Sequence, residues 1–527
     1  MEDHDEAEGR LNNRPELTVS GPGIHDQLRK VCAARGDAPA LQAGERRLSY
    51  RRLLAHVEQV AGTLKALGIG RQTAFAFLSE NCLELMVAYY AAARLGAIFV
   101  PINPSLTARE VAHIVSHSNA LLLFHDEAMR PVVEQAVAAE KRRPLRVLFE
   151  ERPTIQEPIM SSGADEIQRG GSDGNEDFLI IYTSGSTGVP KAVLFDQHAE
   201  IAGNASLIEM WGMSEKDVTL VALPLGFLYG LSTAAATGIQ AGGQVVIQRR
   251  FHPGEVLEAM VSSRATVYHG VPTMFTMMLE YAEQNGVQID LSFMRLLICA
   301  GAPLSTELKA RFEKRFGKGI DDYYALTEVR PVFGRFASDP GPVPAGAIGR
   351  AAPGAIVRIV DGTGTDVADG VHGEVVVRAA STLKRYFKDD ELTRSVFLDG
   401  LFRTGDIGYR DAQGFYHLTG RIKDIIIRGG ANIAPAEVEA VIARHAGVQS
   451  VAVVGVPDRR YGEVAVAFVI KRRGSEVTAS QLSDLCRKEL AEYKVPASFH
   501  FLTDFPLGAT GKVDKRALKG QWSEMLG

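Results

Sequence analysis

Residues 178–191 read FLIIYTSGSTGVPK, an apolar run followed by a loop rich in Ser, Thr and Gly that ends in a lysine. The run Phe178–Ile181 predicts a buried strand, and α/β proteins bind ligands in the loops that follow such strands. Glycines let backbone N–H groups turn around an anion, hydroxyls add donors, and Lys191 adds a compact positive charge. The loop is not a Walker P-loop, because Pro190 precedes its lysine and Ala192 stands where a magnesium-binding hydroxyl is needed. The segment predicts a polyphosphate-binding loop.

The composition is that of a globular protein with more than one domain. A chain of 527 residues is too long for a single hydrophobic core. Apolar residues make up 46% and charged residues 23%, and the net charge of −5 gives no support to nucleic-acid binding. The four cysteines are far apart and form no CxxC pair, which argues against a metal or disulfide framework. A reducing cytoplasm is therefore the expected compartment.

The first twenty residues are expected to be a disordered lead-in. Residues 1–6 are acidic and polar, whereas a signal peptide needs positive charge followed by an apolar core. Along the whole chain no apolar run approaches the roughly 18 residues of a membrane span. The sequence predicts a soluble protein.

Strand and helix patterns alternate from about residue 48 to residue 300. Apolar residues at helical spacing predict helices at 48–70 and 83–95. Residues 150–176 are poor in apolar groups and are interpreted as a surface connection. The predicted strands are 73–78, 97–101, 121–124, 218–223, 244–247, 266–268 and 295–299. This alternation indicates an α/β fold with parallel sheets covered by helices.

The remainder of the chain has a different pattern. Short β-rich pieces between Gly and Asp turns in 345–420 predict a small barrel-like or antiparallel subdomain. After Gly420 a compact α+β unit of two helices and two strands begins. The predicted domains are therefore a lead-in at 1–20, a large N-terminal domain at 21–420, and a small C-terminal domain at 421–527.

Five more segments accompany the phosphate loop, and each is unremarkable by itself. They are Gly301-Ala302-Pro303, Tyr324–Glu328, Arg403–Asp406, Gly420–Asp424 and Gly511–Lys515. In this order and spacing they resemble the adenylate-forming superfamily of acyl-CoA synthetases, peptide-synthetase adenylation domains and luciferases, and most closely its acyl-CoA ligases. The resemblance extends from Leu48 to Lys512. The departures from the usual pattern are Ala192, Ala325 and Phe402.

The resemblance implies an enzyme that activates a carboxylic acid with ATP and Mg²⁺ and then transfers the acyl group to CoA. Glu328 would hold Mg²⁺, Thr327 would donate to the α-phosphate, and Lys512 would bridge the carboxylate and the α-phosphate. ATP would be bound by Thr183, Ser184, Gly185, Ser186, Thr187, Gly188, Lys191, Gly301, Ala302, Pro303, Tyr324, Asp406 and Arg421.

The resemblance also implies that residues 21–420 bind ATP and the acyl group and that residues 421–527 form a mobile lid. For the second half-reaction it implies a rotation of this small domain. Lys423 would be the hinge, and its movement would remove Lys512 and open a tunnel for a thiol. Gly429 and Gly430 would let a pantetheine arm pass close to the backbone. A plain glycine-rich turn is the alternative interpretation.

The acyl pocket is expected to be mainly apolar. Leu228 stands where amino-acid activators carry an acidic partner for the ammonium group, so α-amino acids are disfavoured. Arg330 either forms an ion pair at the rim or meets a polar group of the substrate, and Met277 weakens a malonate-type assignment. The expected pocket residues are Phe227, Leu228, His269, Cys299 and Arg330. For His269 and Cys299 the alternative to a polar contact with the substrate is a buried packing role.

Two further functions stay open at this point. The enzyme could load the acyl group onto a carrier-protein phosphopantetheine instead of CoA, or the chain could be a non-catalytic acyl or nucleotide sensor. Retention of Glu328, Asp406, Lys423 and Lys512 together argues against the sensor. A luciferase-like oxygenase has no residue pattern in its favour. The identity of the acid and the oligomeric state do not follow from the sequence.

Overall fold

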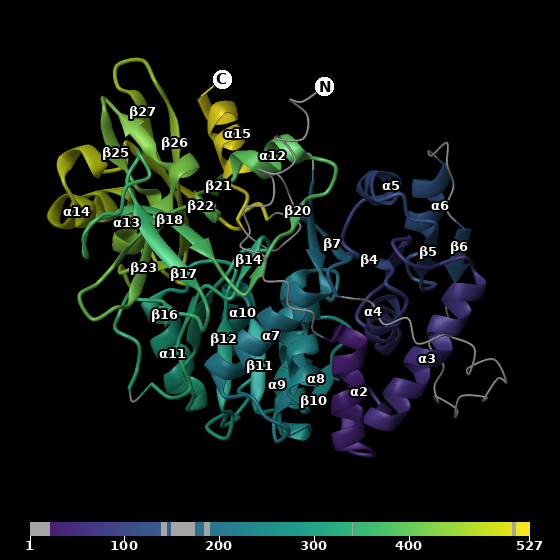
Figure 1. Cartoon of the computed structure of the whole chain (residues 1–527). Coiled ribbons are helices and arrows are strands. Elements are labelled where there is room, and N and C mark those ends of the chain that lie inside the picture. Colours follow the sequence, from purple (N-terminus) through teal and green to yellow (C-terminus); the bar gives the residue numbers. More distant parts are fainter. Residues whose placement is uncertain are drawn as a thin grey trace, which may run out of the picture.

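The computed structural model describes residues 22–138, 145–148, 174–183, 190–339, 341–507 and 513–526. Its larger part consists of two wide sheets with helices between and outside them, and its smaller C-terminal part stands beside them (Figure 1). The predicted α/β class is confirmed. Among the described residues, no helix combines the length and the apolar character needed to cross a membrane.

The first wide sheet carries the phosphate-loop strands. Parallel pairing joins β6 to β5, β5 to β3, β3 to β4 and β4 to β7, while β7–β8 and β8–β20 are antiparallel. The predicted buried strand at 178–181 is confirmed as the centre of β7. In sheet order the strands are β20 (Arg385–Tyr386), β8 (Lys191–Asp196), β7 (Asp177–Thr183), β4 (Ile98–Ile102), β3 (Ala74–Leu78), β5 (Leu122–His125) and β6 (Leu145–Leu148).

The second wide sheet is parallel from β13 to β1, with antiparallel strands at both edges. The predicted strand at 244–247 coincides with β10, and the other predicted strands of this sheet agree to within two residues. In order the strands are β16 (Arg350–Ala351), β15 (Phe333–Gly334), β13 (Asp321–Tyr324), β12 (Leu296–Cys299), β11 (Val267–Gly270), β9 (Val218–Val221), β10 (Gln244–Ile247), β1 (Pro39–Ala43) and β2 (Arg46–Ser49).

Alternating strand residues divide the core into layers. Phe75 and Phe99 of the first sheet and Val221 and Val245 of the second belong to one central core, because side chains on a strand point alternately to opposite faces. That core includes α2 (Ile24–Arg35), α3 (Tyr50–Ala66), α4 (Leu83–Leu95), α7 (Gln197–Trp211), the π-helical segment η2 (Tyr229–Ala236) and α8 (Thr237–Gln240). The outer faces are covered by α5 (Ala108–His117) and α6 (Arg130–Ala138) on the first sheet, and by α9 (Pro253–Ser262), α10 (Pro272–Gln284) and α11 (Thr306–Phe316) on the second.

A smaller antiparallel sheet adjoins the two wide ones. It corresponds to the small β subdomain that the turn-rich pattern of 345–420 predicts. Its strands are β17 (Ile356–Val360), β18 (Gly373–Arg378), β22 (Leu401–Arg410), β21 (Phe397–Leu398) and β23 (Tyr416–Arg421). Nearby, β14 (Val329–Arg330) pairs with β19 (Ser381–Thr382), and the short α12 (Asp390–Ser395) follows β20.

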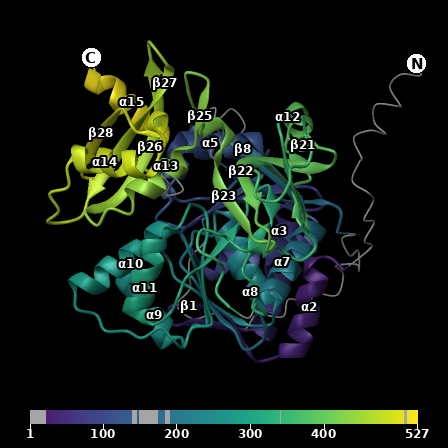
Figure 2. The same ribbon diagram turned by 90° about the vertical axis from the view of Figure 1, so that its left-hand side faces the viewer.

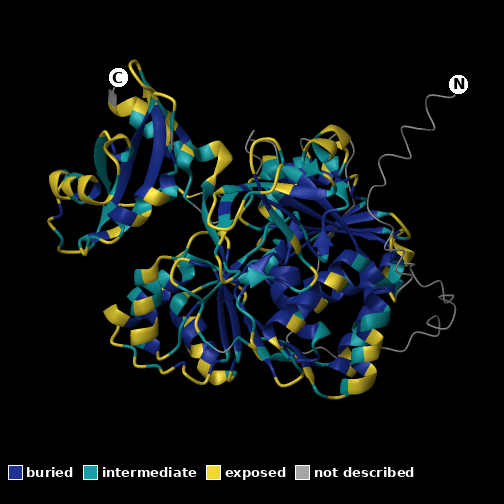
Figure 3. Ribbon diagram, turned by 60° about the vertical axis from the view of Figure 1, so that its left-hand side comes forward, coloured by how far each residue is buried: buried dark blue, intermediate teal, exposed yellow. Residues whose placement is uncertain are grey.

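The C-terminal part has its own sheet and its own buried interior (Figure 3). The chain enters it through the single turn η3 (Ile422–Asp424), between β23 of the small sheet and β24. In the view of Figure 2 it lies above α10 and α11, where Gln449 Nε2 donates to Glu280 Oε1 at 2.8 Å and Arg472 pairs with Glu307. Its elements are β24 (Ile426–Arg428), β25 (Ala431–Ile433), α13 (Pro435–Ile442), β26 (Val448–Asp458), β27 (Gly462–Lys471), α14 (Ala479–Glu489), η4 (Glu492–Lys494), β28 (Ser498–Leu502) and α15 (Lys515–Leu526).

Candidate active site

The two ends of the phosphate loop face each other across a strand pair. Thr183, the last residue of β7, is the register partner of Lys191, the first residue of β8. The antiparallel pairing therefore holds the two ends of the intervening segment next to each other. The predicted ligands Ser184, Gly185, Ser186, Thr187 and Gly188 lie outside the described residues.

Glu328 and Lys191 meet at one aromatic ring. Lys191 Nζ lies 5.3 Å from the ring centroid of Tyr386, and the Tyr386 hydroxyl donates to Glu328 Oε1 at 2.8 Å. Burial and the adjacent Glu328 carboxylate raise the pKa of Tyr386 well above its ordinary value, so its hydroxyl remains a donor. Leu383 N donates to the Glu328 carbonyl at 2.7 Å, which fixes the backbone of that residue. The structure thus places the lysine that ends the phosphate loop beside the predicted metal ligand.

This arrangement fits a magnesium ion. Mg²⁺ in nucleotide-binding proteins is usually held by one or two carboxylates together with substrate phosphates. Glu328 supplies one carboxylate, is only partly buried, and contacts the same Tyr386 side chain as Lys191, the lysine that ends the predicted phosphate loop. A full protein cage of ligands is not needed for an ion held in this way.

Asp406 is the centre of a second polar cluster. Its carboxylate accepts from Arg421 Nε at 2.7 Å and from the Tyr324 hydroxyl at 2.5 Å, and the residue is 3% exposed. Asp406 on β22 and Arg421 on β23 are register partners, so the sheet holds this pair in place. Each carboxylate oxygen has two lone pairs, so Asp406 can also accept hydrogen bonds from ribose hydroxyls.

An aromatic stack supports Tyr324. Its ring is 5.3 Å from that of Phe333 with planes 22° apart, and Phe333 in turn stacks on Tyr416 at 4.3 Å. Gly301, Ala302 and Pro303 follow β12, which is the parallel neighbour of the strand that ends in Tyr324. Gly301 has φ +91°, and all three residues are exposed. Because ligands bind at the carboxyl ends of parallel strands, these residues form one edge suited to a flat base.

The expected acyl-pocket residues fall into two groups. Leu228 is buried directly before η2 and Phe227 precedes it, while His269 is fully buried on β11. His269 is the register partner of Ile298, whereas Cys299 is the partner of Gly270. Cys299 packs in the outer core with α10 and α11, so it faces the opposite side of the sheet from His269. The expectation that Cys299 lines a pocket with His269 is therefore wrong.

Arg330 is not at a rim. It is 1% exposed, and its Nη2 donates to Glu200 Oε1 at 2.8 Å while Nη1 donates to Asn204 Oδ1 at 3.0 Å. Nη2 also lies 2.6 Å from Ser232 Oγ on η2. The predicted rim ion pair is instead a buried one that ties β14, two residues after Glu328, to α7. The sequence could not reveal it, because the two partners are 130 positions apart.

Removing one partner of this pair should destabilise the fold. We expect Arg330→Met to lower the free energy of unfolding by about 3–5 kcal/mol, since Glu200 would be left charged, buried and uncompensated. Arg51→Met, which breaks the exposed pair with Asp37, is the control and should leave the free energy of unfolding close to that of the wild type, because exposed ion pairs contribute little. Urea denaturation followed by circular dichroism measures both. Equal losses in the two variants would contradict the assignment.

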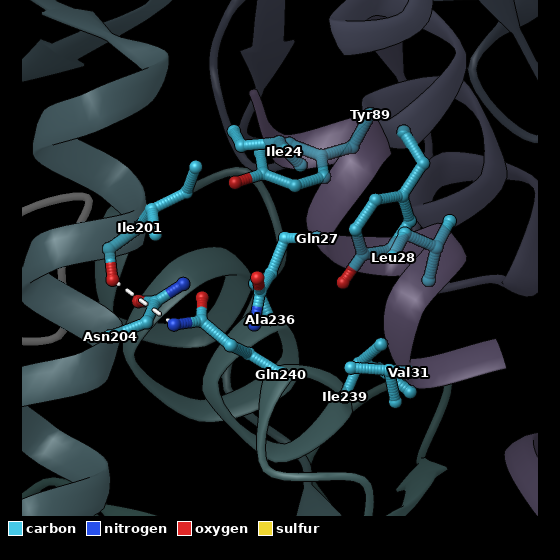
Figure 4. A pocket seen from close by; sticks show the side chains of 11 residues that line it. Ile24, Gln27, Leu28, Val31, Tyr89, Ile201, Asn204, Ala236, Ile239 and Gln240 are labelled. Carbon is cyan, nitrogen blue, oxygen red and sulfur yellow. Dashed lines mark hydrogen bonds between the residues drawn. The ribbon is translucent and has the colours of Figure 1, made fainter. Parts of the chain in front are cut away.

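A small cavity of about 20 Å³ lies between α2, α7 and α8 (Figure 4). Gln240 Nε2 donates to the Ile201 carbonyl at 3.1 Å along its wall, and Asn204 links it to the Arg330 network. None of its lining residues is an expected acyl-pocket residue. The cavity is therefore separate from the two polar clusters described above.

Family models match most of the chain. Residues 28–387 match the AMP-binding enzyme model, and residues 437–512 match the AMP-binding enzyme C-terminal domain. The chain belongs to the AMP-binding enzyme family. The predicted adenylate-forming resemblance is thereby confirmed.

Several relatives of this AMP-binding enzyme are CoA ligases. Indoleacetate–CoA ligase of Aromatoleum aromaticum is 34% identical over 480 residues, 90% of this chain and 93% of that protein. Feruloyl-CoA synthase of an Amycolatopsis species is 33% identical over 496 residues, which are 93% of this chain and 96% of that protein. ATP-bound MatB from Rhodopseudomonas palustris is 27% identical with a TM-score of 0.83, covering 95% of this chain and 100% of its own, and apo MatB gives 0.72. The predicted enzyme class, an AMP-forming CoA ligase, is confirmed.

The C-terminal site residues of this AMP-binding enzyme are only partly described. Lys423 is exposed in η3, and Gly429 and Gly430 form the exposed turn between β24 and β25 with φ of +56° and +88°. Lys512 lies outside the described residues, and the nearest described residues on either side, Leu507 and Val513, form a β-bridge. The hinge, tunnel and catalytic roles of these residues remain predictions.

Proposed function

We propose that this ligase activates an apolar carboxylic acid, of fatty or aryl type, as acyl-AMP and then forms acyl-CoA with release of AMP and pyrophosphate. The meeting of Lys191 and Glu328 at the Tyr386 ring supports the proposal most strongly. A cation suited to a polyphosphate and a carboxylate suited to Mg²⁺ thus contact the same tyrosine side chain. Asp406 and Tyr324 lie on the neighbouring edge, where they can hold a nucleoside.

In the first step a carboxylate oxygen attacks the α-phosphorus of ATP. The new O–P bond replaces the bond to pyrophosphate, and the acid then carries AMP, a far better leaving group than oxide. Thr183 and Lys191 would hold the β- and γ-phosphates, and Thr327 would donate to the α-phosphate. When bound by Glu328, Mg²⁺ supplies positive charge that offsets the negative charge of the phosphates. Lys512 would bridge the two anions that must approach each other.

In the second step the thiol of CoA attacks the acyl carbon and AMP leaves. Rotation about Lys423 would withdraw Lys512 and bring the turn at Gly429 and Gly430 to the acyl group. Positive φ at both glycines gives a backbone turn without side chains, past which a narrow pantetheine arm can run.

The acyl group is proposed to be apolar because of Leu228. This side chain is 4% exposed and has no acceptor for an ammonium group, and an unpaired buried charge costs several kcal/mol. The relatives named for indoleacetate and feruloyl substrates give support to aryl acids, and fatty acids are the other apolar class. Dicarboxylates of the malonate type are disfavoured, because Arg330 is already paired with Glu200.

A panel of acids tests the proposal. Pyrophosphate release from ATP is expected with aryl or fatty acids and not with alanine or phenylalanine. Adding CoA should yield one thioester and one AMP for each pyrophosphate. If phenylalanine were the best substrate, the pocket assignment would be wrong.

The same assay separates the alternative functions. Thioester formation with a holo-carrier protein but not with free CoA would favour carrier loading. Nucleotide binding without any pyrophosphate release would favour a sensor. We place the reaction in the cytoplasm, as expected for a chain whose four cysteines are all free thiols in the structure.

A further inference from the structure

A buried cluster of aromatic rings surrounds His269. The ring centroid of His269 lies 5.2 Å from that of Trp211 and 5.7 Å from that of Tyr229. Tyr323 completes the cluster, 5.2 Å from Trp211 and 6.3 Å from Tyr229. His269, Trp211 and Tyr323 are between 0% and 4% exposed, whereas Tyr229 is only partly buried. We refer to these four residues as the His269 cluster.

The polar atoms of this cluster are not satisfied within the protein. Among the described residues, neither ring nitrogen of His269 has a hydrogen-bond partner, and neither has the Tyr323 hydroxyl. Burial lowers the pKa of His269 to about 3, so the imidazole is neutral with one N–H donor and one acceptor nitrogen. Buried polar atoms are rarely left unpaired, and an unpaired one in a folded protein calls for an explanation. A ligand that supplies the missing partners is such an explanation.

The cluster lies directly behind the proposed active site. His269, Ile298 and Asp321 are on the adjacent parallel strands β11, β12 and β13, whose carboxyl ends carry the nucleotide edge. Tyr323 immediately precedes Tyr324, which contacts Asp406. Tyr229 begins η2 directly after Leu228, and its hydroxyl lies 3.4 Å from the Gly270 carbonyl and 3.3 Å from the Ile298 carbonyl. The partly buried Tyr229 therefore joins the cluster to the acyl-binding segment.

We propose that the His269 cluster forms the far end of the acyl pocket and selects aryl acids whose ring carries a hydrogen-bond donor. The acceptor nitrogen of His269 would receive a ring N–H or a phenolic O–H. The edges and faces of Trp211, Tyr229 and Tyr323 would contact the aromatic ring. This inference rests on the proposed function and narrows its substrate class.

The chemistry of the cluster disfavours a plain alkyl chain. An alkyl chain would displace any water from the cluster and leave both imidazole nitrogens unpaired, with the cost of two buried polar atoms. A site built to pair a substrate O–H or N–H discriminates strongly against analogues that lack the group. Two relatives are named for acyl groups that carry such a donor. Indoleacetate has an indole N–H, and the feruloyl group has a phenolic O–H.

Matched pairs of acids test the selectivity. Indole-3-acetate and 1-benzofuran-3-acetate differ in a ring N–H, and 4-hydroxyphenylacetate and phenylacetate differ in a phenol. For at least one pair, wild-type enzyme should show a kcat/KM for the donor-bearing acid that is on the order of 10- to 100-fold higher. The readout is a ratio for a single enzyme preparation, so it does not depend on the fraction of folded protein.

Substitutions on strand β11 test whether His269 causes the preference for the donor-bearing acid, measured as the ratio of the two kcat/KM values. His269→Phe keeps a ring and removes both nitrogens, so the ratio should fall to about one. His269→Gln keeps a donor and an acceptor and should restore part of it. Tyr268→Phe is the matched control, because Tyr268 faces the outer core on the same strand, and it should leave the ratio unchanged. The KM for ATP should stay the same in all three variants.

The outcomes separate this inference from the proposed function. If aryl acids are activated but the wild-type ratio is near one for both pairs, the inference is overturned while the proposed function stands. The same holds if His269→Phe keeps the ratio, or if a fatty acid is the best substrate. If no acid is activated, the proposed function fails and the inference fails with it. Should His269→Phe not fold, the wild-type ratio alone decides.

Discussion

Lys512→Ala should slow acyl-adenylate formation by about 100- to 1000-fold or more and leave thiolysis of supplied acyl-AMP largely intact. The reason is that the lysine charge is needed only while carboxylate and α-phosphate, both anionic, approach each other. The charge has no corresponding task once the acyl–AMP bond exists. Pyrophosphate release measures the first half-reaction, and thioester formation from synthetic acyl-AMP measures the second.

A neighbouring lysine provides the control for this experiment. Lys515 lies three residues further along and pairs with Glu439 at 2.7 Å within the C-terminal part. Lys515→Ala removes the same charge from the same segment and should leave both half-reactions within a few-fold of wild type. Equal loss of both half-reactions in Lys512→Ala would contradict the assigned role.

Lys423→Pro should have the opposite effect on the two half-reactions. Proline fixes φ near −65°, a value that the turn η3 tolerates but that blocks the change of backbone conformation a hinge needs. We expect adenylate formation to persist and acyl-CoA formation to fall by about 100-fold, as for a misplaced catalytic geometry. Single-turnover formation of acyl-AMP and of acyl-CoA measures the two steps.

Lys423→Ala is the control for the hinge, because it removes the charge but leaves φ free. Thioester formation at the wild-type rate in Lys423→Pro would place the hinge elsewhere.

The match to ATP-bound MatB with a TM-score of 0.83, against 0.72 for apo MatB, is what a family with more than one domain arrangement would give. The contacts of Gln449 with Glu280 and of Arg472 with Glu307 would have to break during the rotation.

Local sequence patterns predicted the central elements of the fold well. The helix at 83–95 and the strand at 244–247 coincide with α4 and β10, because each is a buried apolar run bounded by clear breaks. The segment Arg403–Asp406 lies within the ten-residue strand β22, which the local sequence pattern did not predict. Its pairing with β18 and β23 comes from distant parts of the chain, which a local pattern does not contain.

The candidate site, too, was predicted only where local motifs were sufficient. Motif spacing indicated Glu328, Asp406 and Arg421, and the structure gives these residues close polar partners. Tyr386 was missed, because its contacts with Lys191 and Glu328 depend on the pairing of β20 with β8. The opposite orientations of His269 and Cys299 depend on the register between β11 and β12. Strand alternation predicts such orientations only once that register is known.

Transfer of ¹⁸O from the acid tests the central claim most directly. If the carboxylate attacks the α-phosphorus and the thiol then attacks the acyl carbon, one carboxylate oxygen must leave with AMP. With an acid labelled in both carboxylate oxygens and CoA as acceptor, mass spectrometry should find one ¹⁸O in each AMP and none in pyrophosphate. Label in pyrophosphate or inorganic phosphate, or AMP without label, would contradict the account.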